Sequence, residues 1–132
     1  MANKPTPKQP GSAATTEEWL AYIKAGGKNL EVALPRFANL EGANLKKADL
    51  EGAYLRMVNL RGANLEGASL QGAMAAFANL SGANLKGANL QGANLIGASL
   101  QDADLKRVDL RDACLIGARL KGADLRDANL EG

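Results

Sequence analysis

The stretch ANLEGANLKKADLEGAYLRM, residues 38–57, decides the fold, because it repeats a pattern of five residues that continues to Gly132. Each pentad carries Ala, then mostly Asn, Asp or Ser, then Leu, and mostly Gly two residues later. Leu occupies every fifth position from 40 to 130, except at Ala75. Such in-phase repetition is typical of a repeat protein, in which each unit packs against its neighbours.

A period of five fits neither the 3.6-residue period of an α-helix nor the two-residue period of a flat strand. A helix would also be penalised by its frequent Gly, at roughly 1 kcal/mol each relative to Ala. A chain that turns a corner in every pentad does fit, because Asn, Asp and Gly tolerate turn dihedrals. Each pentad then sends its Leu and its Ala inward and leaves the other three residues to solvent.

These pentads resemble the pentapeptide-repeat family, whose pattern A(N/D)LxG is matched almost throughout residues 38–132. The resemblance implies an all-β solenoid, a right-handed quadrilateral β-helix of about 4.75 coils stacked at roughly 4.8 Å. Departures from the pattern recur after 20 residues, as with Lys86 and Lys106, which is expected when like residues stack between coils. The inward side chains should form a core ladder that includes Leu45, Leu65, Leu85, Leu90, Leu105 and Leu110.

The residues before the repeats divide into two parts. Residues 1–14 are rich in Pro, Lys, Thr, Ser, Ala and Gly, and we interpret them as a flexible arm. Residues 15–37 should form an N-terminal helix and cap, because Thr15 followed by Glu18 fits a capping box and Gly26 fits a helix end. So short a helix needs a surface to pack on, and we expect it to cover the first coil. The predicted end cap is Trp19, Leu20 and Ile23, and the predicted irregular transition is Leu30, Leu34, Pro35 and Phe37.

Composition excludes several classes of function. The 132 residues carry 16 Lys and Arg against 14 Asp and Glu, and a formal charge of +2 argues against binding a polyanion through bulk charge. With one Cys and no His, the chain has no ordinary zinc site and no His-dependent triad. We therefore expect no enzyme activity, cofactor, metal or small-molecule substrate. No apolar run approaches the roughly 20 residues that span a bilayer, so we expect a cytoplasmic protein without membrane contact.

Sorting the outward residues by their position within 20 gives four faces, one of which is apolar. Arg56 is the one charged residue on this face. Contiguous apolar patches commonly mark interaction sites, so we predict an interface for a protein partner or a second copy of the chain. Two alternatives stay open: the N-terminal helix or arm covers part of the face, or Phe77 turns inward to fill the space beside Ala75. We name this face the apolar strip, and it consists of Tyr54, Met57, Met74, Phe77, Ile96, Cys114 and Ile116.

A second face is acidic and supports a different function. Some pentapeptide-repeat proteins are DNA mimics that act on topoisomerases, and this resemblance gives our alternative function. Binding through this face should weaken steeply with salt, whereas binding through the apolar strip should tolerate salt. Nucleic acid is not an expected partner, because no face combines clustered cations with aromatic side chains. The acidic face consists of Asp49, Glu51, Asp109, Asp112 and Glu131, with Arg111 as its cation.

Overall fold

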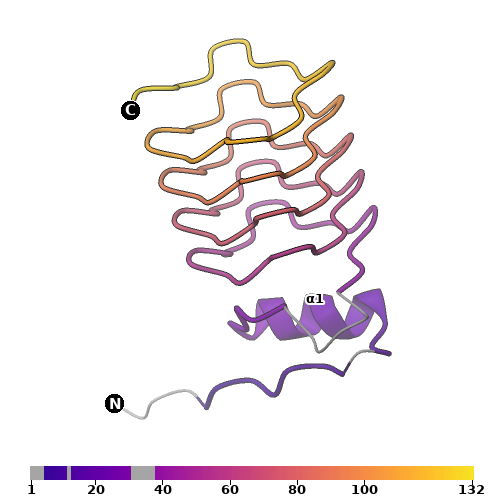
Figure 1. The fold of residues 1–132 in the computed structure, drawn as a ribbon. Coiled ribbons are helices and arrows are strands. Elements are labelled where there is room, and N and C mark those ends of the chain that lie inside the picture. Colours follow the sequence, from indigo (N-terminus) through magenta and orange to yellow (C-terminus); the bar gives the residue numbers. More distant parts are fainter. Residues whose placement is uncertain (1–4, 12, 31–37) are drawn as a thin grey trace.

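The computed structural model describes residues 5–11, 13–30 and 38–132. Its coils stack along one axis, and helix α1, Thr16–Lys24, lies beneath the first coil, residues 38–57 (Figure 1). Within the described ranges α1 is the one helix, and β pairing takes the form of isolated single-residue bridges. The chain is therefore a β-solenoid in which extended strands are reduced to one bridging residue per pentad.

The bridges fix the register of the stack. Each is parallel, and from Asn39 onward each joins residues 20 apart, beginning with Asn39 and Asn59. Hydrogen bonds accompany every bridge, for example from Leu45 N to Asn64 O at 2.7 Å and from Asn64 N to Ala43 O at 2.9 Å. Because every pentad repeats this pattern, equivalent residues of successive coils lie above one another.

Leucine and alanine fill the inside of the coils. Ala75, which stands in place of a Leu, is fully buried. Each buried Leu contributes on the order of 1.5 to 3 kcal/mol through removal from water. Burial decreases toward the last residues, where Leu130 is 55% exposed. The predicted core ladder is at most 4% exposed throughout, at Leu45, Leu65, Leu85, Leu90, Leu105 and Leu110.

The corners explain the remaining positions of the repeat. The side chain before Leu accepts a hydrogen bond from the backbone two residues later, as when Asn44 Oδ1 accepts from Lys46 N at 3.2 Å. The last residue of the pentad has a left-handed φ, which is 65° at Gly62 and suits Gly because it lacks a Cβ. Met57 and Phe77 adopt the same conformation, with φ of 61° and 59°. Asn, Asp and Gly therefore recur because they form the corners.

The helix α1 begins and ends where the sequence predicts. Thr15 is its N-cap, and the Thr15 hydroxyl accepts a hydrogen bond from Glu18 N at 3.2 Å. Ala25 is the C-cap, followed by Gly26 with a φ of 95°. Among the described residues, no helix has both the length and the apolar character needed to cross a membrane.

Residues 28–30 add a layer beneath one side of the first coil. Asn29 forms a parallel bridge with Tyr54, with hydrogen bonds from Tyr54 N to Lys28 O at 2.7 Å and from Leu30 N to Tyr54 O at 3.0 Å. The expectation that Leu30 belongs to an irregular transition is therefore wrong, because Leu30 is paired and fully buried. Outside the described residues lie the other transition residues, Leu34, Pro35 and Phe37.

Part of the predicted arm contacts this layer. Residues 1–4 and 12 of the arm lie outside the described residues. In the described part, Gln9 Nε2 donates to Asn29 O at 3.0 Å, and Ala14 N donates to Gly11 O at 3.0 Å. The contact of Gln9 ties this part of the arm to the layer formed by residues 28–30.

Candidate interaction surfaces

The apolar strip lies on one side of the solenoid, and its members stack in columns. Bridges join Tyr54 to Met74, Met74 to Asn94, and Asn94 to Cys114. Ile96 and Cys114 are partly buried. Five of the seven members are exposed: Met74 at 39%, Tyr54 at 45%, Met57 at 45%, Phe77 at 58% and Ile116 at 72%.

Phe77 does not turn inward, and the alternative in which it replaces the missing Leu is wrong. Its side chain is 58% exposed, whereas Ala75 is fully buried without help from that ring. The reason is the corner: Phe77 holds the left-handed last position of its pentad, with a φ of 59°. Its ring lies against Gly97 in the next coil, where an added Cβ would collide with it.

The N-terminal residues extend the face of the strip and do not cover it. The helix α1 lies beneath the stack (Figure 1), and Asn29 pairs below Tyr54. Tyr54 and Met57, the members nearest to this end, remain 45% exposed. Within residues 5–11, 13–30 and 38–132, the strip is thus open to solvent.

The side chains of α1 pack on the N-terminal end of the core. Trp19 and Ile23 are buried in the same hydrophobic cluster as Leu40 of the first coil. Tyr22 is also buried, and its ring meets that of Trp19 edge-on, with ring centroids 5.9 Å apart. Leu20 is only partly buried against this cluster. The cap therefore closes one part of the end and leaves another part open near Leu20.

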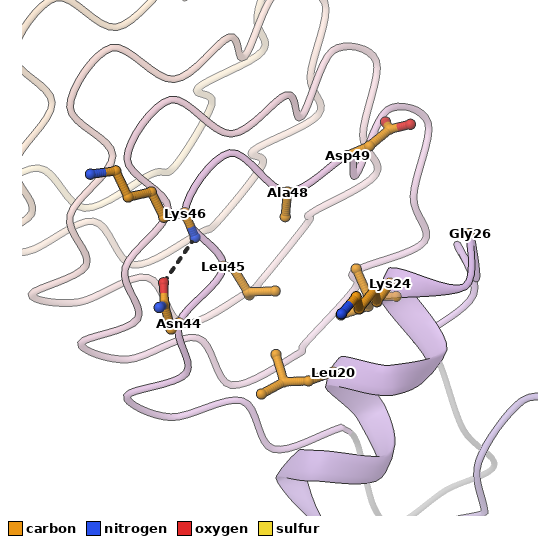
Figure 2. A pocket seen from close by; sticks show the side chains of 9 residues that line it. Leu20, Lys24, Gly26, Asn44, Leu45, Lys46, Ala48 and Asp49 are labelled. Carbon is orange, nitrogen blue, oxygen red and sulfur yellow. Dashed lines mark hydrogen bonds between the residues drawn. The ribbon is translucent and has the colours of Figure 1, made fainter.

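The open part is a groove between α1 and the first coil, which we name the N-terminal groove (Figure 2). It encloses about 450 Å³. The amine of Lys24 extends from α1 toward Leu45 (Figure 2), while the walls are largely aliphatic. The pentad pattern did not predict this groove, because the pattern does not specify where α1 lies. The lining residues are Leu20, Ile23, Lys24, Gly26, Asn44, Leu45, Lys46, Ala48 and Asp49.

Ion pairs within the chain neutralise part of the acidic face. Lys28 Nζ lies 2.8 Å from Asp49 Oδ1, and Arg111 Nη2 lies 2.6 Å from Asp109 Oδ2. The hydrogen bonds from Lys28 and Arg111 hold the pKa of Asp49 and Asp109 below the usual value. Sequence reasoning missed the Lys28 pair, because Lys28 lies outside the repeats. The face therefore carries less uncompensated negative charge than its composition suggests.

The chemistry available on these surfaces is that of contact. In the part of the chain that the structure describes, no group of three or more Cys, Asp or Glu side chains is placed to hold a metal ion. Cys114 is a partly buried free thiol. What the surfaces offer is apolar area on the strip, ion pairs on the acidic face, and backbone groups beside the groove.

A Leu-filled stack of pentads with outward-facing columns of side chains defines a solenoid repeat protein. The chain belongs to the pentapeptide-repeat family: the pattern of the pentapeptide repeats, in eight copies, matches residues 36–72, 76–112 and 103–132. The family expected from the sequence is thereby confirmed. Members of this family fold as quadrilateral β-helices, in agreement with the coiled stack.

Two solved structures illustrate the likeness. The chain is 34% identical to Rfr23, a pentapeptide repeat protein from the cyanobacterium Cyanothece 51142, over 72% of this chain and 82% of that one, with a TM-score of 0.65. It is 33% identical to a pentapeptide repeat protein from the thylakoid lumen of Arabidopsis thaliana, over 66% of this chain, with a TM-score of 0.64. The chain spans 61% of the length of that Arabidopsis protein. No curated protein matches the chain significantly.

Proposed function

We propose that this protein is a non-enzymatic interaction or scaffold module, which binds a protein partner or a second copy of itself through the apolar strip. The observation that carries the proposal is the exposure of five large apolar side chains on one face of a rigid stack. Burying one Phe, Met or Ile side chain contributes about 1.5 to 3 kcal/mol, so a partner that covers several gains substantially. The pentapeptide-repeat family consists typically of structural repeat proteins, which is consistent with this role.

The corner residues of the strip support the proposal. A left-handed φ costs a residue other than Gly roughly 1 to 2 kcal/mol, and Met57 and Phe77 both hold it. Both side chains are exposed, so neither recovers this cost in the core. Lys47 and Arg107 hold the same conformation, but their charges are well hydrated at the surface. For Met57 and Phe77, a contact with a partner is what balances the cost.

The proposal is tested by placing charge in the strip. Ile96→Lys combined with Ile116→Lys should leave the fold intact, since the equivalent positions of another face already carry Lys86 and Lys106. Association of the chain, or capture of its partner from native lysate, should be lost. Light scattering at high protein concentration and a pull-down measure these two outcomes.

A matched control adds the same charge elsewhere. Ser81→Lys combined with Gln101→Lys places two lysines at equivalent positions of a different face and should retain association. If the wild type stays monomeric and no captured protein depends on the strip, the proposal is wrong. Loss of association in both double variants would equally contradict a specific role for the strip.

The alternative function, a DNA mimic that acts on a topoisomerase, receives less support. Lys28 and Arg111 pair with Asp49 and Asp109, and a DNA mimic needs uncompensated negative charge. Salt separates the two functions: binding through the apolar strip should persist at high ionic strength, whereas binding through the acidic face should fall steeply.

Three finer expectations belong to this proposal. We infer a right-handed helix of about 4.75 coils in residues 38–132, which the 20-residue spacing of the bridges supports. We also infer the division into an arm at 1–14, a helix and cap at 15–37, and repeats at 38–132, so that limited proteolysis should cut first in residues 1–14. The cytoplasm stays the predicted compartment, and fractionation of cells tests it.

A further inference from the structure

The bonding rule between coils determines which backbone groups point toward the N-terminal end. In each pentad the N–H before Leu donates toward that end, as from Asn64 N to Ala43 O at 2.9 Å. The N–H of Leu and that of the last residue donate in the opposite direction, as from Leu45 N to Asn64 O at 2.7 Å and from Lys47 N to Glu66 O at 2.9 Å. The first coil therefore has donors and acceptors facing α1 on all four sides.

Residues before the repeats satisfy groups on three of these sides. On the side of Tyr54, residues 28–30 supply a paired segment. On the side of Asp49, Lys28 Nζ donates to Asp49 O at 2.8 Å. On the side of Asn39, Thr16 Oγ1 donates to Asn39 O at 3.3 Å.

The fourth side is the edge of Asn44 and Lys46, and it is unpaired. Among the described residues, no hydrogen bond reaches Asn44 N, Asn44 O or Lys46 O. The Asn44 side chain is engaged with Lys46 N of its own pentad, so it does not cover this edge. An unpaired edge of this kind is a template for the addition of a further strand.

The unpaired edge borders the N-terminal groove. Asn44, Leu45 and Lys46 all line it, and Figure 2 shows them facing α1 across the space. A volume of about 450 Å³ lies within the range of sites that hold small ligands or side chains. Its aliphatic wall is formed by Leu20, Ile23, Leu45 and Ala48. The groove thus combines backbone donors and acceptors with an apolar cavity.

We propose that the N-terminal groove binds an extended peptide by β-strand addition to the Asn44 edge. The ladder rule gives the register: a small residue accepts from Asn44 N, and an aliphatic residue two positions later donates to Asn44 O. The N–H two residues further donates to Lys46 O. The aliphatic side chain then enters the cavity between Leu20 and Leu45. The peptide acts as the pentad that is missing beneath this side of the first coil.

Charge adds a preference at one position of the peptide. In the stack, Glu66 Oε2 lies 3.9 Å from Lys46 Nζ, and both residues directly follow the Leu of their pentads. An acidic residue directly after the aliphatic residue of the peptide therefore lies below Lys46. Lys24, whose amine extends into the groove, adds a second cation. The favoured sequence is small residue, any residue, aliphatic residue, acidic residue.

The test uses a peptide with the sequence of residues 62–67, Gly-Ala-Asn-Leu-Glu-Gly, titrated into the ¹⁵N-labelled full chain. The Asn44 amide resonance should shift in a saturable manner. N-methylation of the peptide Leu removes the donor to Asn44 O and should weaken binding at least tenfold. N-methylation of the peptide Asn is the matched control and should change binding little, because that N–H points away from the first coil.

A charge exchange tests the preference independently. Lys46→Glu should weaken binding of this peptide severalfold, and replacing the peptide Glu by Lys should restore it. The proposal is overturned if the Asn44 resonance does not respond, or if both N-methylated peptides bind alike. It is also overturned if the Asn44 shift follows protein concentration without peptide, since a second copy then fills the groove. None of these results depends on the apolar strip, so the two proposals stand or fall separately.

Discussion

The ring of Phe77 lies against Gly97, one coil further along, and fills the space that a side chain at position 97 would need. Gly92 has nearly the same φ, 67° against 65°, but an added Cβ there meets no atom within 4 Å. The two glycines thus share a backbone requirement and differ in one contact. This pair separates the cost of the corner from the cost of the contact.

We predict that Gly97→Ala destabilises the protein more than Gly92→Ala. Both substitutions place Ala at a left-handed φ, at a cost of roughly 1 to 2 kcal/mol. Gly97→Ala should cost about 1 kcal/mol more, because the Phe77 ring must move away. Urea unfolding measures the difference, and adding Phe77→Ala should abolish it. Equal losses for the two Ala variants would contradict the contact.

Leu90 lies in the middle of the stack and is fully buried. Leu90→Asp should abolish cooperative unfolding, because a carboxylate in this interior has no partner and its burial costs several kcal/mol. The control is Leu130→Asp, since Leu130 is 55% exposed and its change should shift the midpoint only slightly. Thermal melting followed by circular dichroism compares them. A Leu90→Asp protein that melts like the wild type would refute the inward placement of Leu.

Lys28 binds both the carboxylate and the backbone oxygen of Asp49, each at 2.8 Å. Lys28→Gln should lower the free energy of unfolding by up to about 1 kcal/mol, because it releases the N-terminal segment from the first coil. Lys46→Gln is the control: Lys46 Nζ lies 3.9 Å from Glu66, so its loss should have almost no effect. Chemical denaturation of both variants decides, and a larger loss for Lys46→Gln would be the contrary result.

Arg126 gives the C-terminal coil a measurable pH dependence. Its Nε and Nη2 donate to the Asp124 carboxylate at 2.9 and 2.6 Å, which lowers the pKa of Asp124 to about 2. Because this pKa lies below the usual 3.8, the pair stabilises the fold above that pH and the contribution is lost as the pH falls toward 2. We therefore expect the stability of the wild type to decrease over this window.

Arg126→Gln tests the cause of the shift. The pKa of Asp124 should rise toward its usual value, as measured by carboxyl ¹³C NMR, and the loss of stability in acid should become smaller. Arg119→Gln removes the same charge from a different face and should leave the Asp124 titration unchanged. An unshifted Asp124 titration in Arg126→Gln would show that the pair does not form in solution.

Much of the fold was predictable because the sequence specifies it locally. The fifth-residue leucines are large and apolar in every pentad, so their inward placement follows from the hydrophobic effect alone. The ends of α1 were predictable for a similar reason, since Thr15 and Gly26 act on their own neighbouring backbone. The positions of the apolar strip followed from counting, because the register is 20 residues throughout the repeats.

The N-terminal layer was not predictable from counting. Asn29 and Leu30 match the Asn-Leu pair of the repeat, and this was a signal for a paired segment. The 20-residue register would place Leu30 beneath Leu50, whereas Asn29 pairs with Tyr54, 25 residues later. The Lys28 ion pair and the N-terminal groove both depend on this shift of register. They are tertiary features, set by how α1 and residues 28–30 lie on the first coil.

Vertical neighbours that are fixed by a count of twenty give the chain the property of a reading frame with four settings. Twenty residues inserted between Gly82 and Ala83 would lengthen every side and leave each column continuous. Five inserted residues would instead rotate all later side chains by a quarter turn, so that Ile96 and Ile116 would part from Phe77. Changes of length in whole turns preserve a recognition surface, and a single extra pentad composes a different one from the same residues.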